Sequence, residues 1–402
     1  MFIHRDISQQ LSQNPDWIQI LIGPRQCGKS TLFATLGGNF QEVTLDDLRL
    51  RQLAQNDPAL FFQQFEPPLI IDEVQYAPNL FPELKKRIDQ LKRKALLDPA
   101  AGQKKPKVLF RLTGSDQILI DKNIKETLTG RASYYYLNTC TVDEILRANA
   151  AISIKEILFK GGWPELYANE NLSVVNYLNE YIRTCVEKDI VISAGIQKIS
   201  AFHMILGLLA ARTGQLLDYA NISKDSGISG VTVKDWVSTL ERADFLYLLK
   251  PFATSLNKRL IKTPKIYFLD TGLATRLQGW SDSLTLFNSP QIGALFETLA
   301  LAEIVKFIRN YKKDWKLFFW RTKDGDEIDF VLQTNTTTFH GFEVKLSLQN
   351  MPKAISYPAM YEKLFSPQSP LIIITFGGSA LKLSSQCSTL PIAELHDYLM
   401  KL

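Results

Sequence analysis

WIQILIGPRQCGKSTLFATL, residues 17–36, is the stretch that decides the fold of the N-terminal part of this 402-residue chain. It begins as an apolar, strand-like run and ends as a helical run, and between them Gly23–Ser30 fits GxxxxGK[ST] in full. In such a loop the backbone amides and the positive end of the helix surround a phosphate. The stretch therefore predicts a phosphate-binding loop for ATP.

Individual residues of this loop have different predicted roles. Lys29 would reach the β- and γ-phosphates, and Ser30 would ligate Mg²⁺. The other loop residues that would contact the nucleotide are Gly23, Pro24, Arg25, Gln26, Cys27, Gly28 and Thr31. The alternative is a glycine-rich turn before a helix, and the strand and helix on either side of the motif favour the ATP site.

Further polar residues follow apolar runs downstream. The run LIIDE at 69–73 delivers two acids at the end of a predicted strand, where phosphoryl transfer needs a metal ligand and a group that orients water. We assign Asp72 to the metal and Glu73 to the water. A later run, KVLFRLTGS, ends in Thr113, Gly114 and Ser115, which would sense the γ-phosphate or would simply form a turn.

Composition excludes several classes of protein. The chain is 46% hydrophobic and 22% charged, which excludes a mostly disordered chain, and its net charge of +5 is too small to indicate a partner. The four cysteines are far apart and indicate neither a disulfide framework nor a zinc site. Short apolar runs and an N-terminus without an apolar core predict a cytoplasmic protein with no membrane partner.

Residues 17–145 alternate apolar strands with amphipathic segments, which predicts a parallel α/β sheet. Residues 198–265 hold ten Lys/Arg and five Asp/Glu, a net charge of 10 − 5 = +5. They read as helices with a turn at Gly227, then a strand and a basic loop with Lys258, Arg259, Lys262 and Lys265. This pattern predicts a winged helix whose second helix and loop bind DNA, or a packing module with a solvated basic face.

The C-terminal region contains acids at strand and helix spacing. Period-two alternation places Glu327 with Asp329 on one strand face and Glu343 with Lys345 on another. Glu297 falls on an apolar helical face, where an unpaired carboxylate is costly. We predict that Glu297, Asp329, Glu343 and Lys345 converge, with Asp329 and Glu343 on a Mg²⁺ ion and the lysine orienting or deprotonating a water. The alternative is a salt-bridged ladder on a strand surface.

Several motifs in their order resemble a known family, the AAA-type ATPases widespread in bacteria and archaea that carry a C-terminal domain of unknown function. They are GPRQCGKST, LIIDEVQYAPNLFPELKKRID, LTGSDQ, LTGR, KGGWPEL, EKDI, KIYFLDTGLA and GALFETLALAEI. The resemblance implies ATP binding and puts Ser115 at the sensor position. It makes Arg131 of LTGR a candidate for contacting phosphate charge in its own or a neighbouring subunit. The alternative is that Arg131 is a surface or helix-cap arginine without a role in catalysis. A basic insert at 92–107 departs from the family.

Asp329 followed by Glu343-x-Lys345 looks like the D…(D/E)xK motif of restriction-endonuclease-like nucleases, and Glu297 matches their helix acid. The family's C-terminal domain is similar to that fold. We therefore expect an α/β chain: a P-loop ATPase domain (1–150), a helical linker (151–200), a winged helix (201–285) and a restriction-endonuclease-like domain (286–402).

The expected function is ATP hydrolysis coupled to a winged helix and a nuclease-like domain acting on DNA. Two alternatives stay open: an ATP-dependent DNA-binding or regulatory switch with an inactive nuclease-like domain, and a protein-remodelling ATPase. The choice between DNA and RNA and the formation of a homo-oligomer also stay open.

Overall fold

The computed structural model describes residues 1–13, 16–97, 108–115, 127–191, 196–252, 263–321, 326–347, 362 and 369–402. The chain divides into two compact units: an N-terminal unit, His4–Asn138, and a C-terminal unit, Thr139–Leu402 with Met1–Ile3. The N-terminal unit ends before the predicted boundary at 150 because Cys140, Val142 and Ile145 pack into the core of the C-terminal unit.

A parallel sheet with the strand order β2-β3-β4-β1-β5 forms the centre of the N-terminal unit. The strands are β1 (Ile18–Ile22), β2 (Gln41–Thr44), β3 (Leu69–Asp72), β4 (Phe110–Gly114) and β5 (Ala132–Tyr136). Burial of every residue of β1 and β4 explains the continuous apolar runs in the sequence. The predicted parallel sheet is therefore present.

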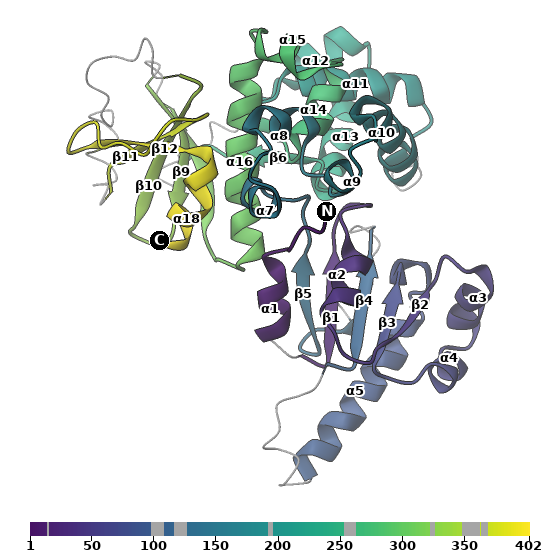
Figure 1. The fold of residues 1–402 in the computed structure, drawn as a ribbon. Coiled ribbons are helices and arrows are strands. Elements are labelled where there is room, and N and C mark those ends of the chain that lie inside the picture. The colour runs from purple at the N-terminus through teal and green to yellow at the C-terminus, as the bar shows by residue number, and fades with distance from the viewer. Residues whose placement is uncertain are drawn as a thin grey trace. The chain divides into compact units, whose positions relative to one another are not determined.

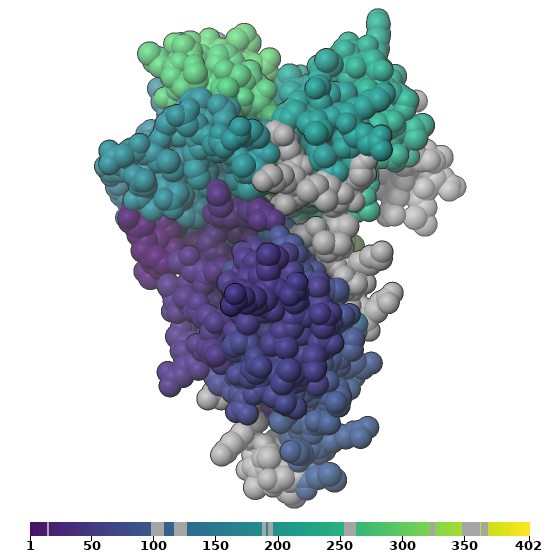
Figure 2. Space-filling view, turned by 90° about the vertical axis from the view of Figure 1, so that its right-hand side faces the viewer, coloured from purple at the N-terminus to yellow at the C-terminus, as the bar shows by residue number. Residues whose placement is uncertain are grey.

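Helices pack on this sheet, with a larger apolar core around Phe61, Phe62 and Phe110 and a smaller one around Phe33 and Leu137. They are α1 (Ile7–Gln13), α2 (Lys29–Thr35), α3 (Leu48–Asn56), α4 (Pro58–Gln64), the 3₁₀ turn η1 (Val74–Tyr76) and α5 (Leu80–Leu97). α3 and α4 lie beside the edge strand β2 and form the part of this unit turned toward the viewer in Figure 2 (Figure 1).

The strand order positions the site of this unit. Because β4 lies between β1 and β3, the loop after β1, the acids after β3 and the polar end of β4 all reach the same edge of the sheet. Parallel strands present their carboxyl ends together, so residues separated by many positions in the sequence become neighbours there.

The first part of the C-terminal unit is helical, as the sequence predicts for residues 151–200. Its elements are α7 (Val142–Ala148), α8 (Ile154–Lys160), α9 (Glu165–Ala168), α10 (Val174–Tyr181) and the π-helical η2 (Ile182–Val191). Then follow α11 (Ile199–Ala211), α12 (Tyr219–Ser226), α13 (Gly230–Arg242) and an antiparallel ribbon of β6 (Leu246–Leu249) and β7 (Lys265–Phe268). Gly227, in the left-handed region at φ 67°, ends α12 and allows the turn into α13.

The prediction that Lys265 belongs to an exposed basic loop is wrong. Lys258, Arg259 and Lys262 lie outside the described residues, but Lys265 is the first residue of β7 and its side chain is only 7% exposed. It is therefore not available on a DNA-facing loop. The reason is ion pairing: carboxylates of the following region surround it, as described below.

The last part contains α14 (Thr271–Leu277), α15 (Ser283–Phe287), α16 (Ile292–Asn310), the 3₁₀ turn η3 (Ile392–Glu394), α18 (Leu395–Met400) and a mixed sheet of order β12-β11-β10-β9-β8. Its strands are β8 (Lys316–Arg321), β9 (Glu327–Gln333), β10 (Phe339–Lys345), β11 (Leu371–Thr375) and β12 (Cys387–Pro391). The sequence of β12, CSTLP, carries little of the apolar signal that marks the other strands. Figure 1 shows α16 beside this sheet.

In the portion of the chain described, no helix is both long enough and apolar enough to cross a bilayer.

Candidate functional site

Two glycines allow the loop after β1 to take its shape. Gly28 has φ 94° and immediately precedes α2, so a side chain there would be strained. A Cβ atom on Gly23 would lie 2.1 Å from the carbonyl oxygen of Leu137. The first and sixth positions of the motif therefore require glycine for reasons visible in this structure.

The Lys29 side chain folds back into the loop. Its Nζ donates hydrogen bonds to the carbonyl oxygens of Gly23, at 3.0 Å, and Pro24, at 2.8 Å. The residue is buried, and both of these acceptors are neutral, so they orient its charge without cancelling it. An anion entering the loop would meet this ammonium group.

The end of the loop is joined to β3 through side chains. Ser30 Oγ donates a hydrogen bond to Asp72 Oδ2 at 3.0 Å, and Thr113 of β4 donates one to the other oxygen of Asp72. A hydroxyl and a carboxylate oxygen are hard ligands of the kind that Mg²⁺ prefers. Ser30 and Asp72, predicted separately as metal ligands, are thus in direct contact.

Glu73 lies beside a second polar pair. Ser115 Oγ donates to Glu73 Oε2 at 2.9 Å, and Gln75 Nε2 donates to the same oxygen and, at 3.3 Å, to Ser115 Oγ. Glu73 has φ 54° and ψ 45°, a left-handed conformation that is uncommon outside glycine. This backbone turn and the two donors fix the direction of the carboxylate. Gln75 was not predicted from the sequence.

The remaining predicted loop residues complete the site. Arg25 Nη2 donates to the Tyr76 hydroxyl at 3.4 Å, and Gln26 also has a positive φ, 58°. Cys27 is fully buried, and burial raises the pKa of its thiol despite the nearby Lys29 and Arg5. Thr31, in the first turn of α2, is exposed.

Arg5 is a residue of this site that the sequence analysis missed. Its guanidinium is buried and donates to the carbonyl oxygens of Cys27, at 2.9 Å, and Asn138, at 2.6 Å. It therefore ties the phosphate-binding loop to the segment after β5. An arginine at the beginning of a chain has no local pattern that would reveal this contact.

Arg131 lies at the other edge of the sheet. It precedes β5, whose first residue pairs with Ile18 at the start of β1, so a strand of roughly 17 Å separates it from its own phosphate-binding loop. Its Nε and Nη2 donate to Asp89 of α5 at 2.7 and 2.9 Å, and this bond lowers the pKa of Asp89. The structure thus contradicts a role on ATP within the same subunit.

A cluster of charged residues lies in the C-terminal unit. Glu297 of α16 accepts hydrogen bonds from Tyr267 Oη, at 2.5 Å, and Lys265 Nζ, at 3.1 Å. Lys265 also pairs with Glu327 Oε1 at 2.6 Å. The helix acid predicted from the sequence is therefore held by β7. Lys265 and Tyr267 were both missed as residues of this site, and they lie on the same face of that strand because they are two positions apart.

The other predicted acids meet on the neighbouring strands. Lys345 Nζ lies 2.8 Å from Glu343 Oε2 and 3.9 Å from Asp329 Oδ2, and the backbone N–H of Val344 donates to Asp329 at 2.9 Å. Asp329 and Glu343 therefore share one lysine across the β9–β10 pair.

The carboxylates influence one another electrostatically. Burial, followed by repulsion from Asp329, raises the pKa of Glu343 to about 7. The same two causes raise the pKa of Glu297. Burial alone would lower the pKa of Lys265, but Glu297, Asp329 and Glu327 outweigh it and raise that pKa. We call these residues, with Tyr267 and Lys345, the acid cluster.

The three predicted acids do not converge on one point. In the part of the chain that the structure describes, Glu297, Asp329 and Glu343 do not form a group with one oxygen atom each, all within 4.8 Å of one another. Lys265 binds Glu297 instead. The pair of Asp329 and Glu343 is the part of the cluster that best fits a divalent cation.

Comparisons with known proteins agree with the N-terminal site. Residues 16–146 match the family described as "AAA domain", which supports a P-loop ATPase domain. Residues 152–284 and 292–395 match two families described as domains of unknown function, DUF8612 and DUF4143.

Similar whole chains include uncharacterized proteins. One from Mycobacterium tuberculosis is 28% identical over 82% of this chain and 70% of its own length. One from Methanocaldococcus jannaschii is 23% identical over 78% of this chain and 72% of its own length.

Among solved structures, the Walker-type ATPase of Pyrococcus abyssi has a TM-score of 0.39 and 15% identity, covering 69% of this chain and 96% of that one. The Aeropyrum pernix ORC2 protein has a TM-score of 0.34 and 12% identity, covering 70% and 93%.

Proposed function

We propose that the N-terminal unit binds ATP with Mg²⁺ and hydrolyses it, and that the nucleotide state controls a DNA-binding C-terminal unit. The observation that carries the first part is the contact of Ser30 with Asp72 beside the Glu73–Ser115 pair. Two hard ligands and a directed carboxylate at the edge of a phosphate-binding loop are what phosphoryl transfer to water requires.

The residues of this site fit a Mg²⁺-bound triphosphate. Lys29 would exchange its two carbonyl partners for phosphate oxygens, and Ser30 and Asp72 would hold the ion. Bound Mg-ATP would supply the scissile phosphoanhydride bond and the charge that polarises it. Glu73 would orient the attacking water, and Gln75 and Ser115 would keep its carboxylate in place.

Turnover of ATP tests this assignment. Glu73→Gln should bind ATP but hydrolyse it poorly, because the amide cannot accept the proton of the water. Lys29→Ala should lose nucleotide affinity. Equal turnover by the wild-type protein and Glu73→Gln would remove Glu73 from the mechanism. Since Arg131 cannot reach its own loop, its proposed contact with phosphate is confined to a neighbouring subunit of a homo-oligomer.

The proposal of DNA binding is supported by the order α11–α12–α13–β6–β7, because three helices followed by an antiparallel ribbon agree with the winged-helix pattern expected from the sequence. Near the start of α13, Val231 and Lys234 are exposed, as expected for residues of a helix that enters a groove. DNA that binds here electrostatically should be released steeply by salt.

A metal-dependent phosphodiesterase in a restriction-endonuclease-like domain is the second candidate function. The observation that favours it is the raised pKa of Glu343 beside Asp329, because a divalent cation would relieve the repulsion between these carboxylates. Asp329 and Glu343 would hold the ion and Lys345 would orient the water, while Glu297 would support the cluster through Lys265. Nicking of plasmid with Mn²⁺, absent in Lys345→Ala, would support cleavage.

If the plasmid stays intact while DNA still binds, the chain is a regulatory switch. If no nucleic acid binds, protein remodelling becomes the better proposal. Neither outcome changes the proposal that the N-terminal unit hydrolyses ATP.

A further inference from the structure

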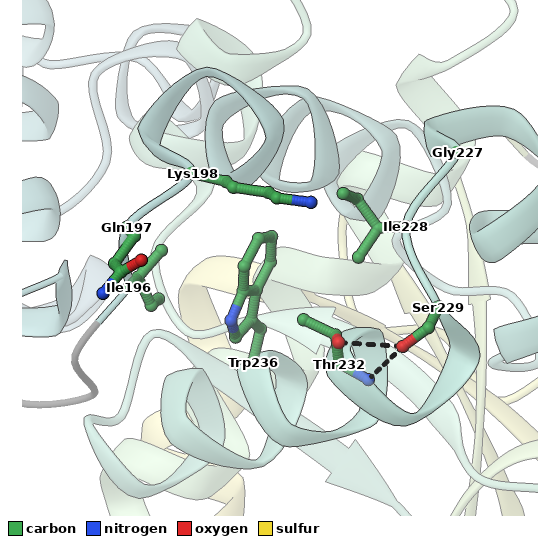
Figure 3. A pocket seen from close by; sticks show the side chains of 8 residues that line it. All are labelled: Ile196, Gln197, Lys198, Gly227, Ile228, Ser229, Thr232 and Trp236. Carbon is green, nitrogen blue, oxygen red and sulfur yellow. Dashed lines mark hydrogen bonds between the residues drawn. The ribbon is translucent and has the colours of Figure 1, made fainter.

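A cavity of about 440 Å³ lies in the C-terminal unit where α11 and α13 begin (Figure 3). Its lining includes Ile196, Lys198, Ile228, Ser229, Thr232 and Trp236. The volume lies in the usual range for small-molecule sites. The acid cluster and the phosphate-binding loop share no residue with it, so it is a separate site.

The positions of the two helices favour an anion here. Lys198 and Ser229 are the N-cap residues of α11 and α13, each 13 residues long. The start of a helix carries partial positive charge and incompletely satisfied N–H groups. Two such ends border one cavity, and none of the described residues that line it is Asp or Glu.

Two side-chain donors point to a ligand independently of the helices. Trp236 is only 8% exposed, and within the described residues neither its indole N–H nor the Lys198 ammonium has a hydrogen-bond partner. Figure 3 shows the Lys198 side chain reaching across the cavity above the Trp236 ring, with the hydrogen-bonded Ser229 and Thr232 on the far side. Lys198 is exposed, so its ammonium group is open to a ligand that enters the cavity, and the indole N–H of the largely buried Trp236 can donate to the same ligand.

The remaining lining is apolar. The indole ring, Ile196 and Ile228 form walls that favour a flat or apolar group. A ligand that suits both halves of the cavity has a phosphate with a planar group attached.

We propose that this cavity binds a nucleotide, with its phosphate at Lys198 and the α13 N-terminus and its base or sugar against Trp236. The nucleotide is either a free mononucleotide or one unit of a nucleic acid. The second source rests on the proposed DNA binding by α11–α13; the first does not.

The test uses the full-length protein with ¹⁵N-labelled tryptophan, and Trp236→Phe assigns the Trp236 indole resonance. The titrants are inorganic phosphate, dTMP and a single-stranded oligothymidylate. Nucleotide binding should shift the Trp236 resonance, and Lys198→Gln should weaken that binding about tenfold because it removes a charge-assisted contact. Lys224→Gln is the matched control, because Lys224 is exposed on α12 and does not line the cavity.

The three titrants distinguish a free nucleotide from a unit of nucleic acid, and they test this site separately from the proposed DNA binding. A shift with dTMP supports a free nucleotide, even if the protein proves not to bind DNA. A shift with the oligonucleotide alone supports a nucleic-acid unit. The proposal is overturned if neither nucleotide shifts the resonance, if inorganic phosphate does so equally well, or if Lys224→Gln weakens binding as much as Lys198→Gln. A normal spectrum of each variant excludes misfolding as the cause.

Discussion

Ser30 and Asp72, 42 positions apart, are joined by a hydrogen bond of 3.0 Å between Ser30 Oγ and Asp72 Oδ2. The bond links the end of the phosphate-binding loop to the third strand. The separation of these two oxygen atoms is close to that of two neighbouring oxygen ligands of one octahedral Mg²⁺ ion, so both could bind the same ion with the serine hydroxyl still protonated.

Asp72→Asn should weaken Mg²⁺-dependent ATP hydrolysis by about 10–100-fold, the usual loss when the surroundings of a metal ion are altered. The amide preserves the shape but removes the charge. The measurement is ATPase rate against Mg²⁺ concentration. Asp46→Asn is the control, because Asp46 is exposed and lies 3.9 Å from Arg51, away from the loop. An unchanged Mg²⁺ dependence in Asp72→Asn would reject the ligand assignment.

Arg5→Met should lower the free energy of unfolding of the N-terminal unit by about 3 kcal/mol, because it leaves the buried carbonyls of Cys27 and Asn138 without these donors. It should also weaken ATP binding, since the loop loses its tie to the segment after β5. Thermal unfolding with and without ATP measures both effects. Arg49→Met, on an exposed position of α3, should change neither.

Lys265→Met should destabilise the C-terminal unit by about 3–5 kcal/mol, because Glu297 and Glu327 would lose a buried counter-charge. Adding Glu297→Gln to this variant should restore part of the loss by removing one of the two carboxylates. Lys250→Met, exposed after β6, is the control for the loss of a lysine. Failure of the double variant to recover any stability would show that Lys265 acts through packing alone.

The stability of the C-terminal unit should depend on Glu343 between about pH 4.5 and 7. The pKa of Glu343 is raised from 4.5 in the unfolded chain to about 7 in the folded protein, so the folded state binds the proton more tightly. Its contribution is complete below pH 4.5 and disappears as the pH rises through 7, a change of up to about 3 kcal/mol. Denaturant unfolding at pH 5 and 7.5 measures it.

Glu343→Gln should flatten this pH profile, since the amide does not titrate. Mn²⁺ should restore stability at pH 7.5 in the wild-type protein if Asp329 and Glu343 share a cation, and should do so less in the variant. Parallel profiles for the two proteins would contradict the assignment to Glu343.

Reversing Lys258 and Arg259 to Glu should weaken DNA binding and reduce its dependence on salt, since fewer counterions would be released. Lys265 is omitted from this test because it is buried. The measurement is affinity against salt concentration, with Lys85 and Lys86 reversed to Glu in the N-terminal unit as control. An unchanged salt slope would favour the alternative, in which the proposed winged helix is a packing module.

The sequence by itself determined the local chemistry of the ATP site. Strand, glycine-rich loop and helix follow one another without interruption, so Lys29 and Ser30 were assigned from neighbours in the chain. Asp72 and Glu73 were also assigned from their neighbours, because they directly follow the apolar run at 69–71. Alternation within β9 and β10 placed Asp329 with Glu327 and Glu343 with Lys345 correctly on strand faces.

Only the tertiary structure decided which distant residues meet. Insertion of β4 between β3 and β1 brings Thr113 and Ser115 to the acids, and the parallel direction of β5 carries Arg131 to the far edge. Pairing of β6 with β7 places Lys265 against α16, so a lysine that looked like part of a basic loop became a buried counter-charge. Periodicity specifies the face on which a side chain lies, but strand order and long-range pairing decide what that face contacts.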